Sequence, residues 1–219
     1  MFRLQTIFFL ALMLVPGLLI HGSCYALQYI EAKGLAFNKN NSSIFAVGEF
    51  SKSAQKGNIK LIANQNSQDG FLACRDINGT TKWAVRFGGA DKDYVSAVDI
   101  DAIGNCYILG TFTGNATFDS YGQASAITLN SKKNSLFLAK YADNGTVLWA
   151  RKPAADPDKG TESWGLDLQV NNEGQIFIGG KFQGFGFFDN KQSPGQNTWD
   201  GFIVQYNPES NNTQQIMNN

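Results

Sequence analysis

The sequence predicts an all-β protein built from about three four-stranded antiparallel units. The 219 residues include 23 glycines and 13% aromatic residues, but only 16% charged residues. That composition suits a chain packed by rings and divided by turns. A segment of about 65 residues recurs along the chain. In each copy, apolar and polar residues alternate between breaks of Gly, Asn and Asp, which is typical of strands. No segment after residue 26 shows helical periodicity.

Residues 1–26 predict a secretory signal peptide. Arg3 is the only charged residue there, Ile7–Ile20 is apolar, and Cys24-Tyr25-Ala26 puts small residues at the cleavage positions. The apolar run is shorter than the roughly 20 residues that span a bilayer, which argues against a membrane anchor. Lipidation of Cys24 is the alternative. We therefore expect a mature chain, Leu27–Asn219, that is secreted, periplasmic or at the cell surface, without an integral membrane segment.

The composition of the chain argues against two classes of function, histidine-based chemistry and nucleic-acid binding. His21 is the only histidine and leaves with the signal peptide, so no His-based nucleophilic catalysis or zinc site is expected. The 18 basic residues balance the 18 acidic ones, which argues against a nucleic-acid partner. Cys74 and Cys106 stay in the mature chain, and the sequence leaves open whether they pair as a disulfide or pack as free thiols.

The repeat is clearest where two segments lie 66 residues apart. Phe71–Trp83 and Phe137–Trp149 share Phe, Leu, Ala, Asn, Gly, Thr and Trp at equivalent positions, and a third copy begins at Phe202–Tyr206. A second recurring strand pattern precedes them at residues 44–50, 106–112 and 176–182. Together these patterns predict two β-hairpins, and hence four strands, in each copy.

Asn-Gly pairs mark two of the predicted hairpins. Asn78-Gly79 and Asn144-Gly145 fall between strand patterns. A two-residue type I′ turn needs positive φ at both central residues, which Asn-Gly adopts at little steric cost. The sequence therefore predicts type I′ turns at both pairs.

The repeat copies resemble a known family. Phe137–Tyr141 and Asn144–Arg151, together with Asp91–Tyr94 and Val98–Gly110, resemble the SBBP type of β-propeller repeat, found largely in secreted or surface-exposed microbial proteins. The resemblance implies propeller blades at about 30–89, 90–153 and 154–206, with a polar Asn/Gln-rich tail at 207–219. Nearly the whole mature chain is covered.

A second, weaker resemblance concerns the tryptophans. The Asn-Gly…Trp segment is similar to the tryptophan-docking repeat of quinoprotein-like propellers, which implies that Trp side chains lock blade to blade. Trp83 and Trp149 occupy equivalent repeat positions, where packing between blades is expected and a sugar-stacking platform is the alternative.

The strand count predicts an incomplete ring. The third copy supplies only about three strands before the polar residues 211–215, whereas propellers close with about four to eight blades. Three explanations stay open: self-association that completes the propeller, completion by another chain, or a truncated relative of a longer protein. The polar tail, lying where a last strand belongs, favours truncation.

Acidic pairs occupy two equivalent connections between copies. Asp91 and Asp93 precede the second copy, and Asp156 and Asp158 precede the third. Carboxylates in loops can hold Ca²⁺ through hard oxygen ligands, while a solvated acidic turn is the simpler interpretation. Ca²⁺ is the only cofactor that the sequence suggests.

These observations favour a non-enzymatic protein. We expect a secreted β-propeller repeat module that acts as a binding scaffold for a protein or glycan partner, although fold alone does not establish function. One alternative is a fragment of a quinoprotein-like or other enzymatic propeller. The other is a purely structural module of a cell-surface assembly.

Overall fold

The computed structural model of the chain describes residues 29–64, 67–153, 162–188, 191–210 and 212–218. The all-β expectation is confirmed: strands make up 72% of the chain, and the described ranges contain no α-helix. No helix within those ranges is long and apolar enough to cross a membrane. The predicted signal peptide, residues 1–26, lies outside the described residues.

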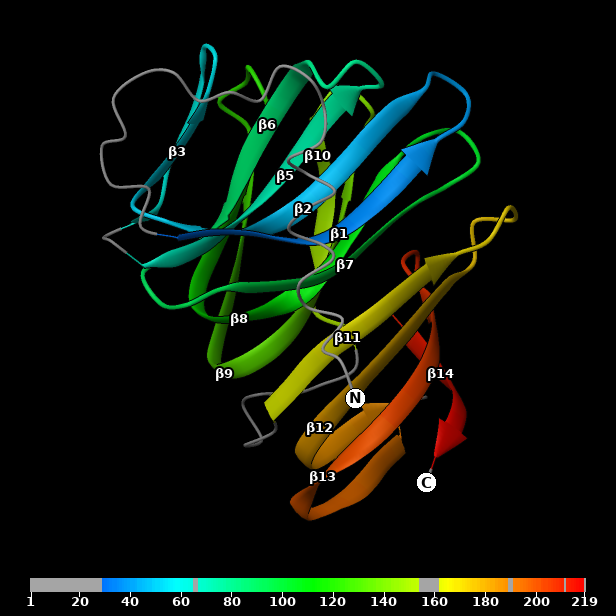
Figure 1. Cartoon of the computed structure of the whole chain (residues 1–219). Coiled ribbons are helices and arrows are strands. Elements are labelled where there is room, and N and C mark those ends of the chain that lie inside the picture. Colours follow the sequence, from blue (N-terminus) through cyan, green and yellow to red (C-terminus); the bar gives the residue numbers. More distant parts are fainter. Residues whose placement is uncertain (1–28, 65–66, 154–161, 189–190, 211, 219) are drawn as a thin grey trace, which may run out of the picture.

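Twelve of the strands form three antiparallel four-stranded units that follow one another along the chain (Figure 1). Unit 1 consists of β1 (Tyr29–Asn38), β2 (Ser43–Ser51), β5 (Gln68–Asp76) and β6 (Thr81–Gly88). Unit 2 consists of β7 (Tyr94–Ile100), β8 (Cys106–Asp119), β9 (Ala126–Tyr141) and β10 (Val147–Arg151). Unit 3 consists of β11 (Glu162–Val170), β12 (Ile176–Phe188), β13 (Lys191–Asn207) and β14 (Asn212–Asn218).

Unit 3 differs from the sequence prediction. The expected polar tail instead contains β14, which pairs antiparallel with β13 over residues 202–207. Asn is a poor strand former by propensity. Here the exposed edge of β13 supplies backbone partners that outweigh that propensity. The third unit therefore has four strands, as the first two do.

The units pack face to face, and each junction has its own apolar core. We call the side of a unit that faces the preceding unit its front face, and the opposite side its rear face. One core cluster joins the rear of unit 1, including Phe45 and Leu72, to the front of unit 2, including Ile108 and Phe137. A second cluster joins the rear of unit 2 to the front of unit 3. Both clusters exclude water from strands that are far apart in the sequence.

The first strands of the three units, β1, β7 and β11, lie side by side near the centre of the molecule (Figure 1). Among the described residues, strand pairing between units is found at the ends of β6 and β8, where Phe87 pairs with Phe118 and Gly88 with Thr117. Side-chain packing, rather than a continuous ladder, therefore holds the units together.

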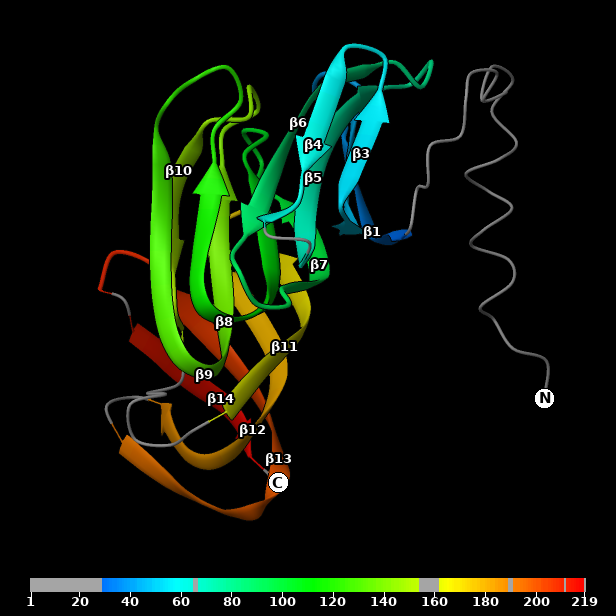
Figure 2. The ribbon, with the colours of Figure 1, turned by 90° about the vertical axis from the view of Figure 1, so that its left-hand side faces the viewer.

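Each unit carries a hairpin extension between its second and third strands, which we call an arm. In unit 1 the arm is a separate hairpin, β3 (Ser53–Lys56) with β4 (Ile59–Ile62). In unit 2 the arm is the outer part of β8 and β9, residues 114–119 paired with 126–131 beyond a register shift. Unit 3 has residues 185–188 paired with 191–194. Figure 2 shows the β3–β4 arm beside β5 and β6.

The opposite end of every unit carries tight turns, and these correct the predicted turn type. Gly79 N donates to Asp76 O over 3.0 Å and Asp76 N donates to Thr80 O over 3.0 Å, so the loop has three residues. Gly79 has φ 83° and Gly145 has φ 85°, but neither Asn78 nor Asn144 has positive φ. This is a type I turn followed by a glycine bulge, because the third loop residue takes the left-handed conformation alone.

Candidate functional site

A buried ionic cluster lies where the arm end of unit 1 meets unit 2. Arg86 on β6 is at its centre, with Nη1 donating to Asp69 Oδ2 over 2.8 Å and Nε donating to Asp119 Oδ2 over 3.2 Å. The Asp69 side chain is fully buried, while that of Asp119 is 38% exposed. Ser67 Oγ and Asn64 N also donate to Asp69. The three strands β5, β6 and β8 thus meet in one charged group.

Burial and charge act in opposite directions on this cluster. Burial disfavours the charged guanidinium, but hydrogen bonding and the charges of Asp69 and Asp119 outweigh it, so the pKa of Arg86 is raised. Burial raises the pKa of Asp119, and the attraction of Arg86 opposes that rise. Arg86 is therefore a fixed positive charge, held between two carboxyl groups.

Asp93 is close to this cluster and has a distinct environment. Its side chain is fully buried, Oδ2 accepts a hydrogen bond from Gly89 N at 2.7 Å, and Oδ1 has no partner. Burial raises its pKa from an ordinary value near 3.8 to about 7, with the charges of Asp69 and Asp91 adding to the rise. Because Gly88 has no Cβ, the Asp93 and Asp69 carboxyl groups both approach its backbone, and a Cβ there would lie 2.7 Å from Asp93 Oδ2 and 3.0 Å from Asp69 Cγ.

Of the four residues expected to bind Ca²⁺, the structure describes Asp91 and Asp93. Asp91 is exposed and Asp93 is buried, so the two carboxylates of that pair face different surroundings. Asp156 and Asp158 lie outside the described residues. Within the ranges that the structure describes, no group of three or more His, Cys, Asp or Glu side chains has the arrangement that a metal ion needs. The Ca²⁺ site stays a prediction.

The two tryptophans of the repeat both lie on rear faces. Trp83 is 5% exposed in the first junction, where its Nε1 donates to Asp143 O over 2.8 Å. Trp149 is half-buried against the second core cluster, with its ring 5.9 Å from Tyr107 and 6.5 Å from Tyr206. Each indole contacts the unit that follows.

The structure describes both cysteines of the expected mature chain, which the sequence left open as a disulfide or as free thiols. Cys74 and Cys106 are both free thiols, buried in the core cluster between units 1 and 2. Burial raises the pKa of both thiols. They pack as small hydrophobic side chains, and they offer no reactive thiolate at neutral pH.

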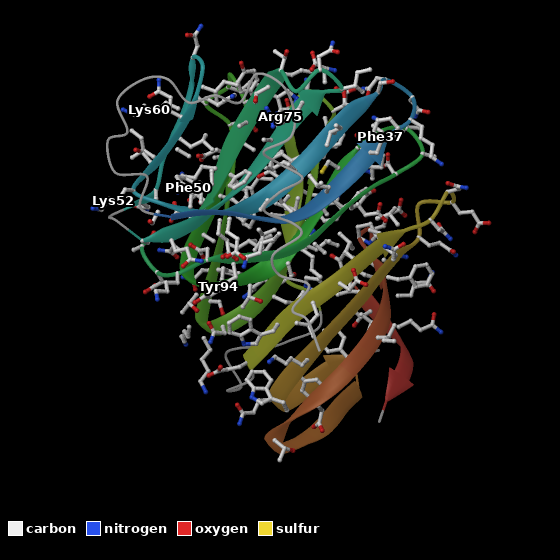
Figure 3. All side chains as sticks on the ribbon, in the orientation of Figure 1. Phe37, Phe50, Lys52, Lys60, Arg75 and Tyr94 are labelled. Atoms are coloured by element: carbon white, nitrogen blue, oxygen red, sulfur yellow. The ribbon has the colours of Figure 1, made fainter. Side chains whose placement is uncertain are left out.

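A pocket of about 340 Å³ opens beside the ionic cluster, between the β3–β4 arm and the strands β6 and β8. Its polar lining includes Arg86, Asp119 and Asn58, and Lys60, labelled on the arm in Figure 3, is also among the lining residues. Tyr121 also lines it, 42% exposed, with its ring 6.5 Å from that of Trp83. Ile59 and Leu61, together with Ala84 and Val85, supply the apolar part of the wall. The pocket thus combines donors, acceptors and an aromatic ring.

The sequence did not point to most of these residues. Arg86, Asp119 and Tyr121 belong to no motif, and they come together because β6 of unit 1 pairs with the end of β8 of unit 2. Asp69 did carry a signal, because Asp69-Gly70-Phe71 recurs as Asp200-Gly201-Phe202. Recurrence in two copies indicates a position with a structural role in the repeat.

Neither a scan against protein-family models nor a search of curated proteins finds a match for this chain.

Proposed function

We propose that the protein is a secreted, propeller-type repeat module that binds a glycan without catalysing a reaction. The fold part of the proposal is supported by the three face-to-face units, by the adjacency of β1, β7 and β11, and by the resemblance of the repeat to SBBP sequences. Blades that face one another with their first strands innermost are the arrangement of a propeller. The described units make an open array of three.

The observation that carries the binding part is the pocket beside the β3–β4 arm. Ligand pockets combine an apolar wall with a few convergent polar groups, and this pocket has both. Arg86 is ion-paired with both Asp69 and Asp119, so it offers hydrogen bonding more than positive charge. A neutral, hydroxyl-rich ligand matches such a surface, because each hydroxyl both donates and accepts.

Tyr121 adds the second element of sugar recognition. An exposed ring presents an apolar face and a polar hydroxyl, and a pyranose has a C–H face that packs on such a ring. Tyr121 and the Arg86–Asp119 pair line the same pocket. The glycan is the partner class, among those expected from the sequence, that uses all of these groups.

Binding is tested by titrating the purified chain with short glucan, galactan, xylan and chitin oligosaccharides in a calorimeter. We expect one class to bind, and Tyr121→Ala and Asp119→Asn to weaken that binding at least tenfold. Leu148→Ala is the matched control, since Leu148 is 47% exposed on β10 and is not among the pocket residues. Unchanged oligosaccharide length after incubation supports binding over catalysis. Equal binding by all variants, or none by the parent, contradicts the proposal.

A further inference from the structure

The front face of unit 1 has the residue pattern of an interface but is only partly covered: Phe50, the equivalent of Phe112 and Phe182, is 0% exposed, while other positions of the face are not buried. At equivalent strand positions, the front faces of units 2 and 3 bury their apolar side chains almost completely. The buried residues are Ile108, Phe137 and Ala139 in unit 2, and Ile178, Phe202 and Val204 in unit 3. Their equivalents in unit 1 are Ala46, Phe71 and Ala73, which are only half-buried.

The first strand of unit 1 shows the same contrast more strongly. Leu35 is 54% exposed and Phe37 is 52% exposed, whereas Leu168, at the position of Leu35 in unit 3, is 1% exposed. Figure 3 shows Phe37 near the end of β1. A contiguous apolar face of this kind indicates an interaction site. The internal junctions indicate what kind of surface would cover this face. The equivalent faces of units 2 and 3 are covered by the rear face of a four-stranded unit.

One rear face of the chain is also uncovered. Phe45, Val47 and Leu72 are 0% exposed on the rear of unit 1, and unit 2 buries its equivalents as completely or nearly so. On the rear of unit 3 the equivalent of Leu72 is Ile203, which is 39% exposed. Leu166 and Trp199 of unit 3 are 54% and 43% exposed. Each chain therefore has one open front and one open rear.

From these equivalences we infer that a second copy of this chain docks head to tail, with the rear face of its unit 3 on the front face of unit 1. The contact repeats the internal junctions, so no new packing geometry is needed. A heterologous contact of this type generates a closed ring if its rotation closes. Two chains then form a ring of six units with two identical junctions. This inference is independent of glycan binding.

The test is the mass of the purified chain by light scattering behind size exclusion, at several concentrations. We expect a dimer for the parent chain. The front variant Leu35→Glu and the rear variant Ile203→Glu each alter both junctions of the dimer, and both are expected to elute as monomers. Each raises the concentration for half-dissociation at least tenfold. Ile103→Glu is the matched control, because Ile103 is 82% exposed at a hairpin tip away from both faces, and it is expected to remain a dimer.

Mixing the two interface variants distinguishes head-to-tail from head-to-head contact. A mixed pair keeps one junction with both faces parental, so a dimer peak returns on mixing. Melting curves of the separate variants show that each is folded. A parent chain that stays monomeric at all concentrations overturns the inference. So does a dimer that Leu35→Glu dissociates and Ile203→Glu does not, because that result indicates two front faces in contact.

Discussion

The two internal junctions share one backbone arrangement but are stabilised by different chemistry. In the first junction, Asp69 and Asp93 are buried carboxyl groups beside Arg86. In the second, Ser135 and Ser163 occupy the equivalent positions, and Ser163 Oγ accepts a neutral hydrogen bond from Leu136 N at 3.0 Å. At these two equivalent positions the carboxyl groups of the first junction are replaced by hydroxyl groups in the second. A repeat holds its fold while its polar groups diverge.

The difference extends to the direction of pH dependence. Burial raises the pKa of Glu49 in the first junction, with Lys33 opposing the rise. On the rear face of unit 2, Asp101 is also buried, but hydrogen bonds from Asn105 and the nearby Lys140 outweigh burial and lower its pKa. A raised carboxyl pKa weakens the fold as pH rises, and a lowered one weakens it as pH falls. The two junctions are therefore expected to fail at opposite ends of the pH range.

The largest expected effect is the loss of Arg86. Arg86→Met leaves the buried Asp69 carboxylate without its ion-pair partner, and removing one member of a buried pair costs about 3–5 kcal/mol. The measurement is the urea midpoint for unfolding. Arg151→Met is the control, because Arg151 is exposed at the end of β10, and its substitution is expected to change stability by less than about 0.5 kcal/mol. Equal midpoints for the two variants would show that the cluster does not stabilise the first junction.

The second prediction concerns Asp93. Its folded pKa of about 7 lies above the ordinary value near 3.8, so the folded state binds the proton more tightly. Its contribution is full below about pH 3.8 and is lost as pH rises through about 7. Asp93→Asn is expected to remove on the order of 2 kcal/mol of this pH dependence. Melting temperatures of parent and variant between pH 4 and 8 test it, and parallel curves would contradict it.

A comparison of two glycine turns distinguishes the cost of backbone strain from the cost of steric contact across a junction. Gly145 and Gly174 have φ 85° and 78°, so alanine is strained at both. A Cβ at Gly145 lies 2.8 Å from Tyr121 and 3.0 Å from Trp83, whereas nothing lies within 4 Å at Gly174. Gly145→Ala is expected to cost about 1–3 kcal/mol more than Gly174→Ala, as for other overpacked sites. Denaturant midpoints measure the difference. Equal losses of stability in the two variants would mean that Tyr121 and Trp83 move to accommodate the added methyl group at no cost in free energy.

The smallest difference is expected between the two tryptophans. Both are replaced by phenylalanine, which keeps a ring in each junction. Trp83→Phe also removes the hydrogen bond to Asp143 O, which is worth about 1 kcal/mol. Trp149 is half-buried, and Trp149→Phe is expected to cost less. If thermal unfolding shows Trp149→Phe as the more damaging change, the second junction depends on its aromatic packing more than the first.

Several features of the fold could be predicted because they depend on neighbouring residues. Alternating apolar residues locate the strands, and the Asn-Gly pairs locate two hairpins, since strand pleat and turn strain are local. The turn type was wrong because a loop of two or three residues leaves similar sequence signals. The fourth strand of unit 3 was missed because the Asn residues around it have low strand propensity. The edge of β13, not the composition of β14, decides the pairing.

The candidate site depends on tertiary contacts that cannot be predicted from the sequence. Asp91 and Asp93 were singled out as a pair, yet one is exposed and the other is buried beside Asp69. Arg86, Asp119 and Tyr121 carry no motif and meet at the pocket because the end of β6 pairs with the end of β8. Such proximity follows from the packing of one unit on the next, and a repeat pattern does not contain it.

By itself, the sequence determined that this chain is an all-β repeat whose strands alternate between two faces, because side chains point to opposite sides of a strand at every second residue. Only the tertiary structure decided which of those faces are covered. The apolar residues Phe71 and Phe137 are equivalent in sequence, but the second is fully buried and the first is not. Burial depends on whether a neighbouring unit is present, and that is a property of the packed array.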